Sequence, residues 1–299
     1  MIQLEGMTTE TPNLKTVNLD TMSTREILQV MNEEDASVPV AIAKVLDQIE
    51  KAIELIASSL EKGGRLIYIG AGTSGRIGLL DAVECPPTFG TYPDQVVGLL
   101  AGGHQAFIKA VEGAEDDREL GIEDLKAIHL SVEDTVVGIA ASGRTPYVIG
   151  ALEYANEVGA PTVAIACNKD SAVGKVAQVA IEVVPGPEIL TGSTRLKAGT
   201  AQKLVVNMLS TVSMVRIGKV YKNLMVDVQQ TNEKLRVRAE NIVMEATSCK
   251  REVARNYLEM AEGSVKLAIT MILLNCDKEE ATKQLEQAKG HIRKAINRS

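Results

Sequence analysis

The feature that most constrains the fold is a glycine-rich turn between a short apolar run and a helical segment. The run, Leu66–Ile69, has the character of a strand buried on both faces. The turn contains Gly70, Gly72 and Gly75, and from Arg76 onward apolar residues recur at helical spacing. A strand, a glycine-rich turn and a helix N-terminus together form an anion site, because backbone N–H groups can approach a ligand there and the first ones of the helix are unpaired.

The helix after this turn is expected to span about 74–85. Its last residues include Glu84, and Cys85 is followed by Pro86 and Pro87, which we expect to end the helix. A carboxylate at the end of a helix that begins at an anion site is a first indication of chemistry rather than of binding alone.

Four more apolar runs follow, and amphipathic segments alternate with them. The strand candidates are Val96–Leu100, Val136–Ala140, Thr162–Ala166 and Ala180–Val184, and the helices between them are expected at about 105–127, 146–158 and 172–177. This alternation predicts an α/β fold with a doubly wound, five-stranded parallel sheet flanked by helices. In such sheets ligands bind beyond the carboxyl ends of the strands, near the point where the strand order reverses.

Helical segments precede and follow the sheet, and they divide the chain into three predicted parts. Residues 1–40 predict an extended arm and a short helix that starts at a capping box of Ser23 and Glu26. Residues 41–220 predict the sheet domain, which also holds a long helix from Pro39 to Gly63 and another from Ser193 to about Ile217.

The third part, residues 221–299, is highly charged and predicts an entirely helical C-terminal region. We expect it to end in three short helices, at about 248–260, 263–275 and 278–297, which form a small bundle.

Composition and charge exclude several classes of protein. The net charge is −7 without a run rich in Lys or Arg, so neither a nucleic-acid partner nor an anionic membrane surface is expected. No apolar run approaches about 18 residues and no signal peptide is visible, which predicts a cytoplasmic protein without a membrane partner. The four cysteines are far apart in the sequence, which predicts reduced thiols.

The glycine-rich turn also matches the dinucleotide-binding fingerprint, GxGxxG. That fingerprint requires an acidic residue at the end of the second strand to bind a ribose. Here the strand Val96–Leu100 ends in Ala101-Gly-Gly-His104, without a carboxylate. The polar pair Thr73 and Ser74 suits a small phosphorylated ligand better.

Two other polar loops follow strands of the predicted sheet. Ser142, Gly143 and Thr145 come after the third strand and before Pro146; they form either a second anion pocket or a plain helix cap by Thr145. The block 188–199 follows the last strand with a run of hydroxyl and basic side chains, and it is either a cap or part of the same pocket. Two such loops at one edge of a sheet favour the functional interpretation.

The acidic cluster after the second strand contains Glu112 and Glu115. Taken alone, such a cluster is typical of a solvated face or a helix start. The three histidines, His104, His129 and His291, are too dispersed to bind a metal ion, so no metal site is expected.

Four blocks of the sequence resemble, in order and spacing, the N-acetylmuramic acid 6-phosphate etherases, a family of sugar-isomerase (SIS) domain proteins. The blocks are IGAGTSGRIGLLDAVECPPTFG, AGGHQAFIKAVEGAEDD, GIAASGRTPYVIGAL and EILTGSTRLKAGTAQK. The resemblance covers nearly the whole chain and is more specific than any single glycine loop. It implies a SIS-type sheet, a C-terminal helical bundle, a homodimer with the active site near the subunit interface, and no metal or organic cofactor.

The reaction that this resemblance implies is cleavage of the lactyl ether of N-acetylmuramic acid 6-phosphate to N-acetylglucosamine 6-phosphate and D-lactate, in cell-wall sugar recycling. The acid/base residues of the family map onto Glu84 and Glu115. Substrate-binding residues are then expected in three places: Gly72, Thr73 and Ser74 near the sugar, and Ser142, Gly143, Thr145, Ser193 and Thr194 around the phosphate.

The chemistry of the two glutamates follows from the reaction. Removal of an ether group β to a carbonyl needs a base for the α proton and an acid for the leaving oxygen. From the family we assign Glu115 as the base at C2 and Glu84 as the acid. An apolar surround that raises the pKa of Glu84 would separate the two roles.

Two other functions remain open on the sequence alone. A sugar-phosphate-binding regulator, like the glucokinase regulatory proteins that share the SIS domain, would keep the phosphate loops but would need no acid/base pair. An aldose–ketose isomerase of the same fold would move a C2 proton but would not need an acid for a leaving group.

Overall fold

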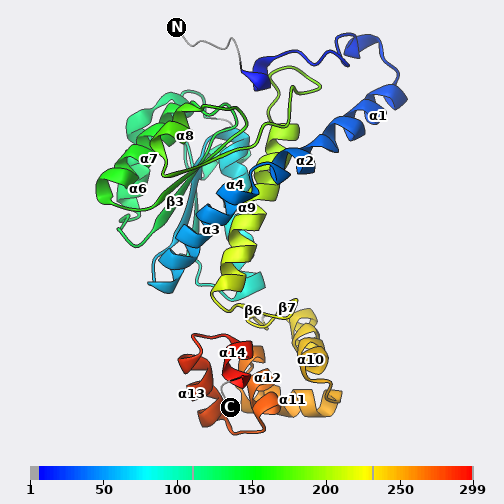
Figure 1. Ribbon diagram of the computed structural model, residues 1–299, viewed down its shortest axis with the longest axis vertical. Helices are drawn as coiled ribbons and strands as arrows, with labels where there is room; N and C mark the ends of the chain where they lie inside the picture. Colours follow the sequence, from blue (N-terminus) through cyan, green and yellow to red (C-terminus); the bar gives the residue numbers. More distant parts are fainter. Residues whose placement is uncertain (1–6, 110, 231, 298–299) are drawn as a thin grey trace. The chain divides into compact units, whose positions relative to one another are not determined.

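The computed structural model describes residues 7–109, 111–230 and 232–297. The chain divides into two compact units, residues 1–83 with 94–210 and residues 84–93 with 211–299. The first unit contains a parallel five-stranded sheet and the second is mostly helical (Figure 1).

The sheet has the strand order β2-β1-β3-β4-β5, and all neighbouring strands are parallel. Its strands are β1 (Leu66–Gly70), β2 (Val96–Leu100), β3 (Thr135–Ile139), β4 (Thr162–Ala166) and β5 (Val179–Glu182). Every residue of β1, β3 and β4 is buried, as expected for strands covered on both faces. The predicted fold class is confirmed, and each observed strand starts within a residue of its predicted position.

The strand order reverses between β1 and β3, so the loops after these two strands flank the switch point of the sheet. Gly70 at the end of β1 pairs with Leu100 of β2 and with Ile139 of β3. Three strands therefore end at the same level, and the loops that follow them emerge together at one edge.

Helices cover both faces of the sheet (Figure 1). One face carries α6 (Arg118–Ala127), α7 (Pro146–Val158) and α8 (Ala172–Val176), and the other carries α3 (Leu46–Glu61), α4 (Gly72–Phe89) and α9 (Lys197–Arg216). Leu125 of α6 and Leu152 of α7 are fully buried in the core between helices and sheet. This burial fixes the frame from which the loops emerge.

The N-terminal segment of the first unit holds two 3-10 turns and two helices. These are η1 (Thr8–Glu10), η2 (Leu19–Thr21), α1 (Thr24–Asp35) and α2 (Ser37–Ala43). The predicted capping box of Ser23 and Glu26 is present at the start of α1. The long helix predicted up to Gly63 is wrong in one respect: the N–H groups of Lys44 and Val45 close tight i→i−3 turns, which separate α2 from α3.

The single helix predicted over 105–127 is also wrong. The chain forms α5 (Gln105–Ile108), the turn η3 (Ala114–Asp116) and then α6. Gly113 adopts φ +80°, a left-handed conformation that a continuous helix does not contain. Asp117 then starts α6, since its side chain accepts a hydrogen bond from Leu120 N.

Helix α4 does not end before Pro86, contrary to the prediction, but continues to Phe89. The fixed φ of proline is compatible with a helix, and the two missing N–H groups deprive only carbonyls near the helix end of their partners. Gly90 N bonds Pro86 O at 2.9 Å, and the positive φ of Gly90, +61°, then ends the helix.

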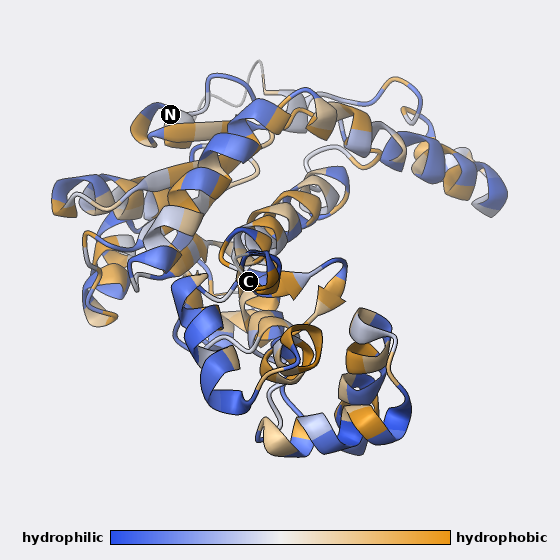
Figure 2. Ribbon diagram, turned by 60° about the horizontal axis from the view of Figure 1, so that its bottom comes forward, coloured by the Kyte–Doolittle hydropathy of each residue, from blue (hydrophilic) through white to orange (hydrophobic). Residues whose placement is uncertain are grey.

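The second unit has its own hydrophobic core. Its elements after α9 are β6 (Val220–Tyr221), β7 (Leu224–Met225), α10 (Glu233–Thr247), α11 (Arg251–Met260), α12 (Val265–Leu274), α13 (Lys278–Gln287) and α14 (Ile292–Ile296). Val243, Ala268 and Ile269 are buried in this core, and Figure 2 shows hydrophobic and hydrophilic residues side by side along the helices.

The prediction of an entirely helical C-terminal region is therefore wrong for β6 and β7, which form a small antiparallel pair. The last predicted helix is divided into α13 and α14, because Gly290 between them adopts φ +76°. Among the helices of the described residues, none combines the length and the apolar character needed to cross a bilayer.

Candidate functional site

The turn after β1 exposes an unpaired helix N-terminus. Gly72 has φ +53° and begins α4, and the first i→i−4 bond there runs from Gly75 N to Ala71 O at 3.2 Å. The N–H groups of Gly72, Thr73 and Ser74 thus precede the helical hydrogen bonds, and the positive end of the helix dipole adds to their attraction for an anion. A Cβ on Gly75 would lie 2.4 Å from Gly70 O, so the tight turn requires glycine there.

A cavity of about 170 Å³ adjoins this turn, and it brings Glu115 close to Gly72. Its lining residues are Ala71, Gly72, Arg76, Ala101, Ala106, Val111, Glu112, Gly113 and Glu115. Glu115 lies in η3 with an exposed side chain. The first predicted loop and one predicted catalytic residue, 43 positions apart in the sequence, therefore share a cavity.

Arg76 anchors the segment that carries Glu115. Its Nη2 donates to Ala106 O at 2.6 Å and its Nε to Phe107 O at 3.0 Å, so the guanidinium group of α4 holds the carbonyl groups of α5. Sequence reasoning missed this role, because nothing in the spacing relates Arg76 to the backbone of α5.

The loop after β3 is held in a tight conformation. Gly143 has φ +76°, and a Cβ at this position would lie 2.5 Å from Ser171 Cβ. Thr145 occupies the N-cap position of α7, but its side chain makes no capping hydrogen bond. The interpretation of Thr145 as a plain helix cap is therefore wrong, and the residue is half-buried.

Asn168, which follows β4, holds the loop after β3 through its side-chain amide. Its Nδ2 donates to Ala141 O and to Ser142 O, both at 3.3 Å, and to Thr9 Oγ1 at 3.1 Å. Its Oδ1 accepts from Thr9 N at 3.3 Å. The N-terminal arm and the β3 loop are thus joined through one buried amide, a residue that the sequence did not single out.

The block 188–199 supplies its own helix cap. The Glu188 carboxylate accepts from Lys197 N and from Ala198 N, each at 2.9 Å, at the start of α9. Burial raises the pKa of Glu188, and the two backbone N–H groups offset only part of that effect. The N-terminus of α9 is already occupied by a carboxylate, so of the two open interpretations this end of the block is a cap.

The turn before α9 lies against the first glycine turn. Ser193 and Thr194 are half-buried there, and Thr194 O accepts from Gly199 N at 2.9 Å. A Cβ at Gly199 would lie 3.5 Å from Thr194 O and 3.5 Å from Thr73 Cγ2. The structure therefore brings Thr73 and Thr194, predicted in different loops, to the same place.

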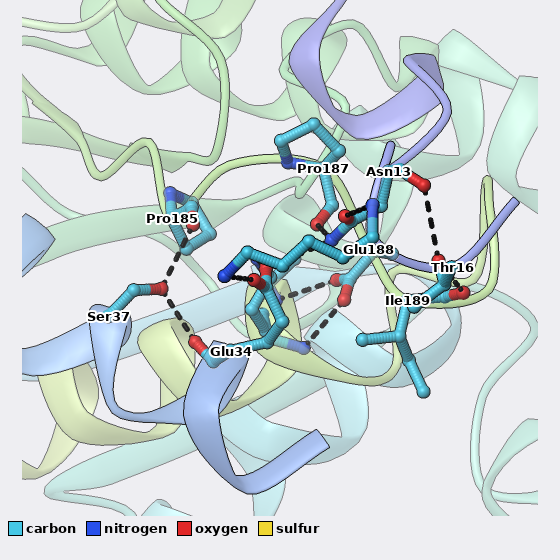
Figure 3. A network of polar contacts seen from close by, with 11 residues as sticks. Asn13, Thr16, Glu34, Ser37, Pro185, Pro187, Glu188 and Ile189 are labelled. Atoms are coloured by element: carbon cyan, nitrogen blue, oxygen red, sulfur yellow. Dashed lines mark hydrogen bonds and ion pairs between the residues drawn. The ribbon is translucent and has the colours of Figure 1, made fainter. Parts of the chain in front are cut away.

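A buried ionic network supports this edge of the sheet (Figure 3). Lys197 Nζ donates to Glu34 Oε2 at 2.6 Å, Asn13 Nδ2 to the same oxygen at 3.0 Å, and Lys15 Nζ to Oε1 at 2.8 Å. Burial alone would raise the pKa of Glu34, but the hydrogen bonds from Lys15 and Lys197, the charge of Lys197 and the amide of Asn13 together lower it to about 2.

The same network binds the N-terminal arm to the loop after β5. Asn13 Nδ2 also donates to Pro187 O at 3.3 Å, and Thr16 Oγ1 donates to Ile189 O at 2.8 Å (Figure 3). These bonds hold in place the segment that leads to Glu188 and to the start of α9.

Glu84 lies on an exposed stripe of α4. Leu80 and Pro87, four residues before it and three after it, are also exposed, and so is the adjacent Val83. The apolar surround expected for Glu84 is thus incomplete in a single chain, because the helix turns this face outward.

The described ranges, 7–109, 111–230 and 232–297, contain no group of three or more His, Cys, Asp or Glu side chains arranged to bind a metal ion. None of the four cysteines forms a disulfide, and burial raises the pKa of the Cys167 thiol to about 12.

Two family models match parts of the chain. Residues 48–156 match the glucokinase regulatory protein N-terminal SIS domain, and residues 120–212 match the SIS domain. An N-acetylmuramic acid 6-phosphate etherase from Bacillus cereus is 63% identical over 271 residues, which cover 91% of this chain and 92% of the relative. The chain belongs to the N-acetylmuramic acid 6-phosphate etherases.

A second etherase, from Lactiplantibacillus plantarum, is 62% identical over 274 residues, which cover 92% of this chain and 93% of that relative. Among solved structures, a phosphoheptose isomerase from Francisella tularensis superposes with a TM-score of 0.51 at 18% identity, over 65% of this chain and 100% of the isomerase. At that identity the likeness shows only that the etherase shares the fold of the isomerase.

Proposed function

We propose that this etherase cleaves the lactyl ether of N-acetylmuramic acid 6-phosphate, with Glu115 as the base and Glu84 as the acid. The observation that carries the proposal is the cavity between the loops after β1 and β2, which Glu115 and Gly72 line together. A carboxylate beside an unpaired helix N-terminus offers a base next to donors for substrate oxygens.

The reaction proceeds as elimination followed by addition. Glu115 removes the proton from C2 of the open-chain sugar, the C3–O bond breaks, and a double bond forms between C2 and C3 in conjugation with the C1 aldehyde. The departing lactate oxygen takes a proton from Glu84. Exchange with solvent then removes the proton from Glu115 and returns one to Glu84. Glu115 deprotonates a water molecule that adds at C3, and the proton it has taken passes to C2, which gives N-acetylglucosamine 6-phosphate and D-lactate.

Substrate contacts are proposed at the loops that emerge from the sheet. The phosphate is held by Ser142, Gly143 and Thr145 with the hydroxyls of Ser193 and Thr194, and Gly72, Thr73 and Ser74 face the sugar. The uncapped Thr145 hydroxyl and the contact of Thr73 with the turn of Thr194 support this arrangement.

We further propose a homodimer in which a second copy of the chain covers the exposed stripe of α4. Leu80 and Val83 on this stripe are 52% and 56% exposed, and both flank Glu84. Burial of this stripe by a partner would exclude water from around Glu84. The four cysteines, none of which is in a disulfide, fit a cytoplasmic location.

The decisive experiment is a D-lactate release assay with N-acetylmuramic acid 6-phosphate in the presence of EDTA. Glu84→Gln and Glu115→Gln should each lower kcat at least about 100-fold, because each removes an acid/base group. Glu119→Gln, an exposed glutamate four residues from Glu115, is the matched control and should keep the wild-type rate. Normal turnover in Glu84→Gln would contradict its role as the acid.

A sugar-phosphate-binding regulator is the second candidate, because residues 48–156 match the SIS domain of a regulatory protein. Such a protein would bind N-acetylmuramic acid 6-phosphate without releasing lactate. Absence of lactate from folded wild type with tight binding of the sugar phosphate would favour the regulator, and formation of a ketose phosphate would favour an isomerase.

A further inference from the structure

Gln202 of α9 is buried beside the first turn of α4 with part of its amide unpaired. The residue is 1% exposed, and its Oε1 accepts a hydrogen bond from Ser74 Oγ at 3.0 Å. Within the described part of the chain, Gln202 Nε2 has no hydrogen-bond partner. A buried amide nitrogen without a hydrogen-bond partner is uncommon in folded proteins. Its desolvation costs free energy that an apolar side chain of similar size would not cost, so its presence here needs an explanation.

The Gln202 amide sets the direction in which the Ser74 hydroxyl donates its hydrogen bond. In the observed arrangement its single proton points toward Gln202 Oε1, so its oxygen can offer only lone pairs elsewhere. Ser74 also lies in the first turn of α4, where backbone N–H groups precede the helical hydrogen bonds and can bind a ligand oxygen. A hydroxyl that offers lone pairs at such a site repels the oxygen of a ligand rather than binding it.

A half-turn of the amide about its last torsion angle reverses this polarity. Gln202 Nε2 would then donate to Ser74 Oγ, and the hydroxyl proton would be free to point toward a ligand oxygen. Before the turn two amide N–H bonds are unmade, and after it one N–H and the carbonyl oxygen are unpaired. Without a ligand the turned state also leaves the Ser74 hydroxyl proton unpaired, so the observed state is favoured. A hydrogen bond from Ser74 to a ligand oxygen removes this difference and can shift the amide to the turned state.

We propose that Gln202 is a positioning residue that orients the Ser74 hydroxyl toward an oxygen of the bound sugar phosphate. This inference rests on the proposed function for the sugar phosphate and its contact with Ser74. The neighbourhood supports it, since Gly199, one turn before Gln202 on α9, lies against Thr73 of the same α4 turn.

The test is a double-mutant cycle measured with N-acetylglucosamine 6-phosphate by calorimetry. Gln202→Met keeps the size of the side chain but removes the amide, and Ser74→Ala removes the hydroxyl. Each alone should weaken binding about 3- to 10-fold, whereas Gln202→Met added to Ser74→Ala should weaken it no further, because Gln202 acts through Ser74.

Gln202→Glu gives a sharper readout. Its carboxylate can only accept, so it holds the Ser74 proton permanently and should weaken binding at least 10-fold near pH 7. Lowering the pH protonates the carboxyl group and should restore part of the affinity, which a purely structural role would not predict. In combination with Ser74→Ala, the Gln202→Glu change should have little further effect, whereas direct repulsion of the ligand would weaken binding equally in both backgrounds.

Three results would overturn the inference: an unchanged affinity in Ser74→Ala, an equal loss from Gln202→Met with and without Ser74, or an equal loss from Gln202→Glu in both backgrounds. Thermal unfolding of each variant identifies any that fails to fold, and Gln202→Met keeps the cycle interpretable if the buried carboxylate does not fold. Lactate release by wild type tests the proposed function separately, and the binding cycle can be read whether or not lactate is formed.

Discussion

Glu34 joins α1 to the start of α9 through the side chain of Lys197. Its carboxylate pairs with Lys197, whose side chain is 2% exposed, and with Lys15, whose side chain is 60% exposed. The first pair is buried and the second is on the surface, so the two should contribute very differently to stability.

We expect Glu34→Gln to lower the free energy of unfolding by about 3–5 kcal/mol, because it leaves the buried charge of Lys197 unpaired. Lys15→Met, the control at the exposed partner, should cost much less, because a solvent-exposed ion pair contributes little to stability. Denaturant unfolding of both variants measures the difference. Equal costs would mean that burial of Lys197 does not govern this network.

The same carboxylate predicts a pH dependence. The pKa of Glu34 falls from its ordinary value of 4.5 to about 2 in the folded chain, so its contribution to stability is complete above about pH 4.5 and is lost as the pH falls through 2. The unfolding free energy of wild type should therefore fall more steeply over this range than that of Glu34→Gln. Parallel curves for the two proteins would contradict the lowered pKa.

At the residue scale the sequence identified the glycines and glutamates of the proposed site but not the side chains that hold them. Ser74 and Gln202 are separated by 128 positions, and Thr9 and Asn168 by 159. The spacing of a motif relates only residues that are close together in the sequence. A single buried asparagine or glutamine is not part of a periodic sequence pattern. Such partners become visible only once strands and helices are placed.

At the scale of elements, the loop after β3 shows why one position in a turn must be glycine. We expect Gly143→Ala to raise KM for the sugar phosphate at least several-fold and to destabilise the protein, because the added Cβ would lie 2.5 Å from Ser171 Cβ on a backbone with φ +76°. The shift of the loop would displace the phosphate donors proposed at Ser142 and Thr145.

Gly159→Ala is the matched control for this prediction. Gly159 also has a positive φ, +89°, at the end of α7, but a Cβ there would meet only Val132 Cγ1 at 3.8 Å. Gly159→Ala should lower the free energy of unfolding by about 1 kcal/mol through backbone strain alone and should leave KM unchanged. Steady-state kinetics and denaturant unfolding of both variants separate the clash from the strain.

The sheet was predictable from the sequence because strands buried on both faces appear as short apolar runs, and those of β1, β3 and β4 have no exposed residue. Helix ends were harder. Gly113 and Gly290 interrupt helical patterns through positive φ values, while Pro86 and Pro87 are tolerated within α4 because they fall near its end. Composition does not distinguish these cases; backbone conformation does.

At the scale of the whole molecule, the exposed stripe of α4 predicts the oligomeric state. We expect wild type to be a dimer in light scattering and Leu80→Glu to be largely monomeric, because a carboxylate in a buried apolar interface is unpaired and desolvated. The substitution should leave thermal unfolding of the dissociated chain nearly unchanged, since Leu80 is 52% exposed in a single chain. Lactate release should fall with dimer content, because the same stripe carries Glu84.

Val132→Glu is the control for this last prediction, since Val132 is 56% exposed but lies outside α4, in the loop before β3. It should remain dimeric and fully active. A monomeric wild type, or a dimer that survives both Leu80→Glu and Val83→Glu, would show that another face forms the interface. Monomers of Leu80→Glu that still release lactate would also contradict the role of the interface in catalysis, because Glu84 would then donate its proton without the desolvation that a second subunit provides.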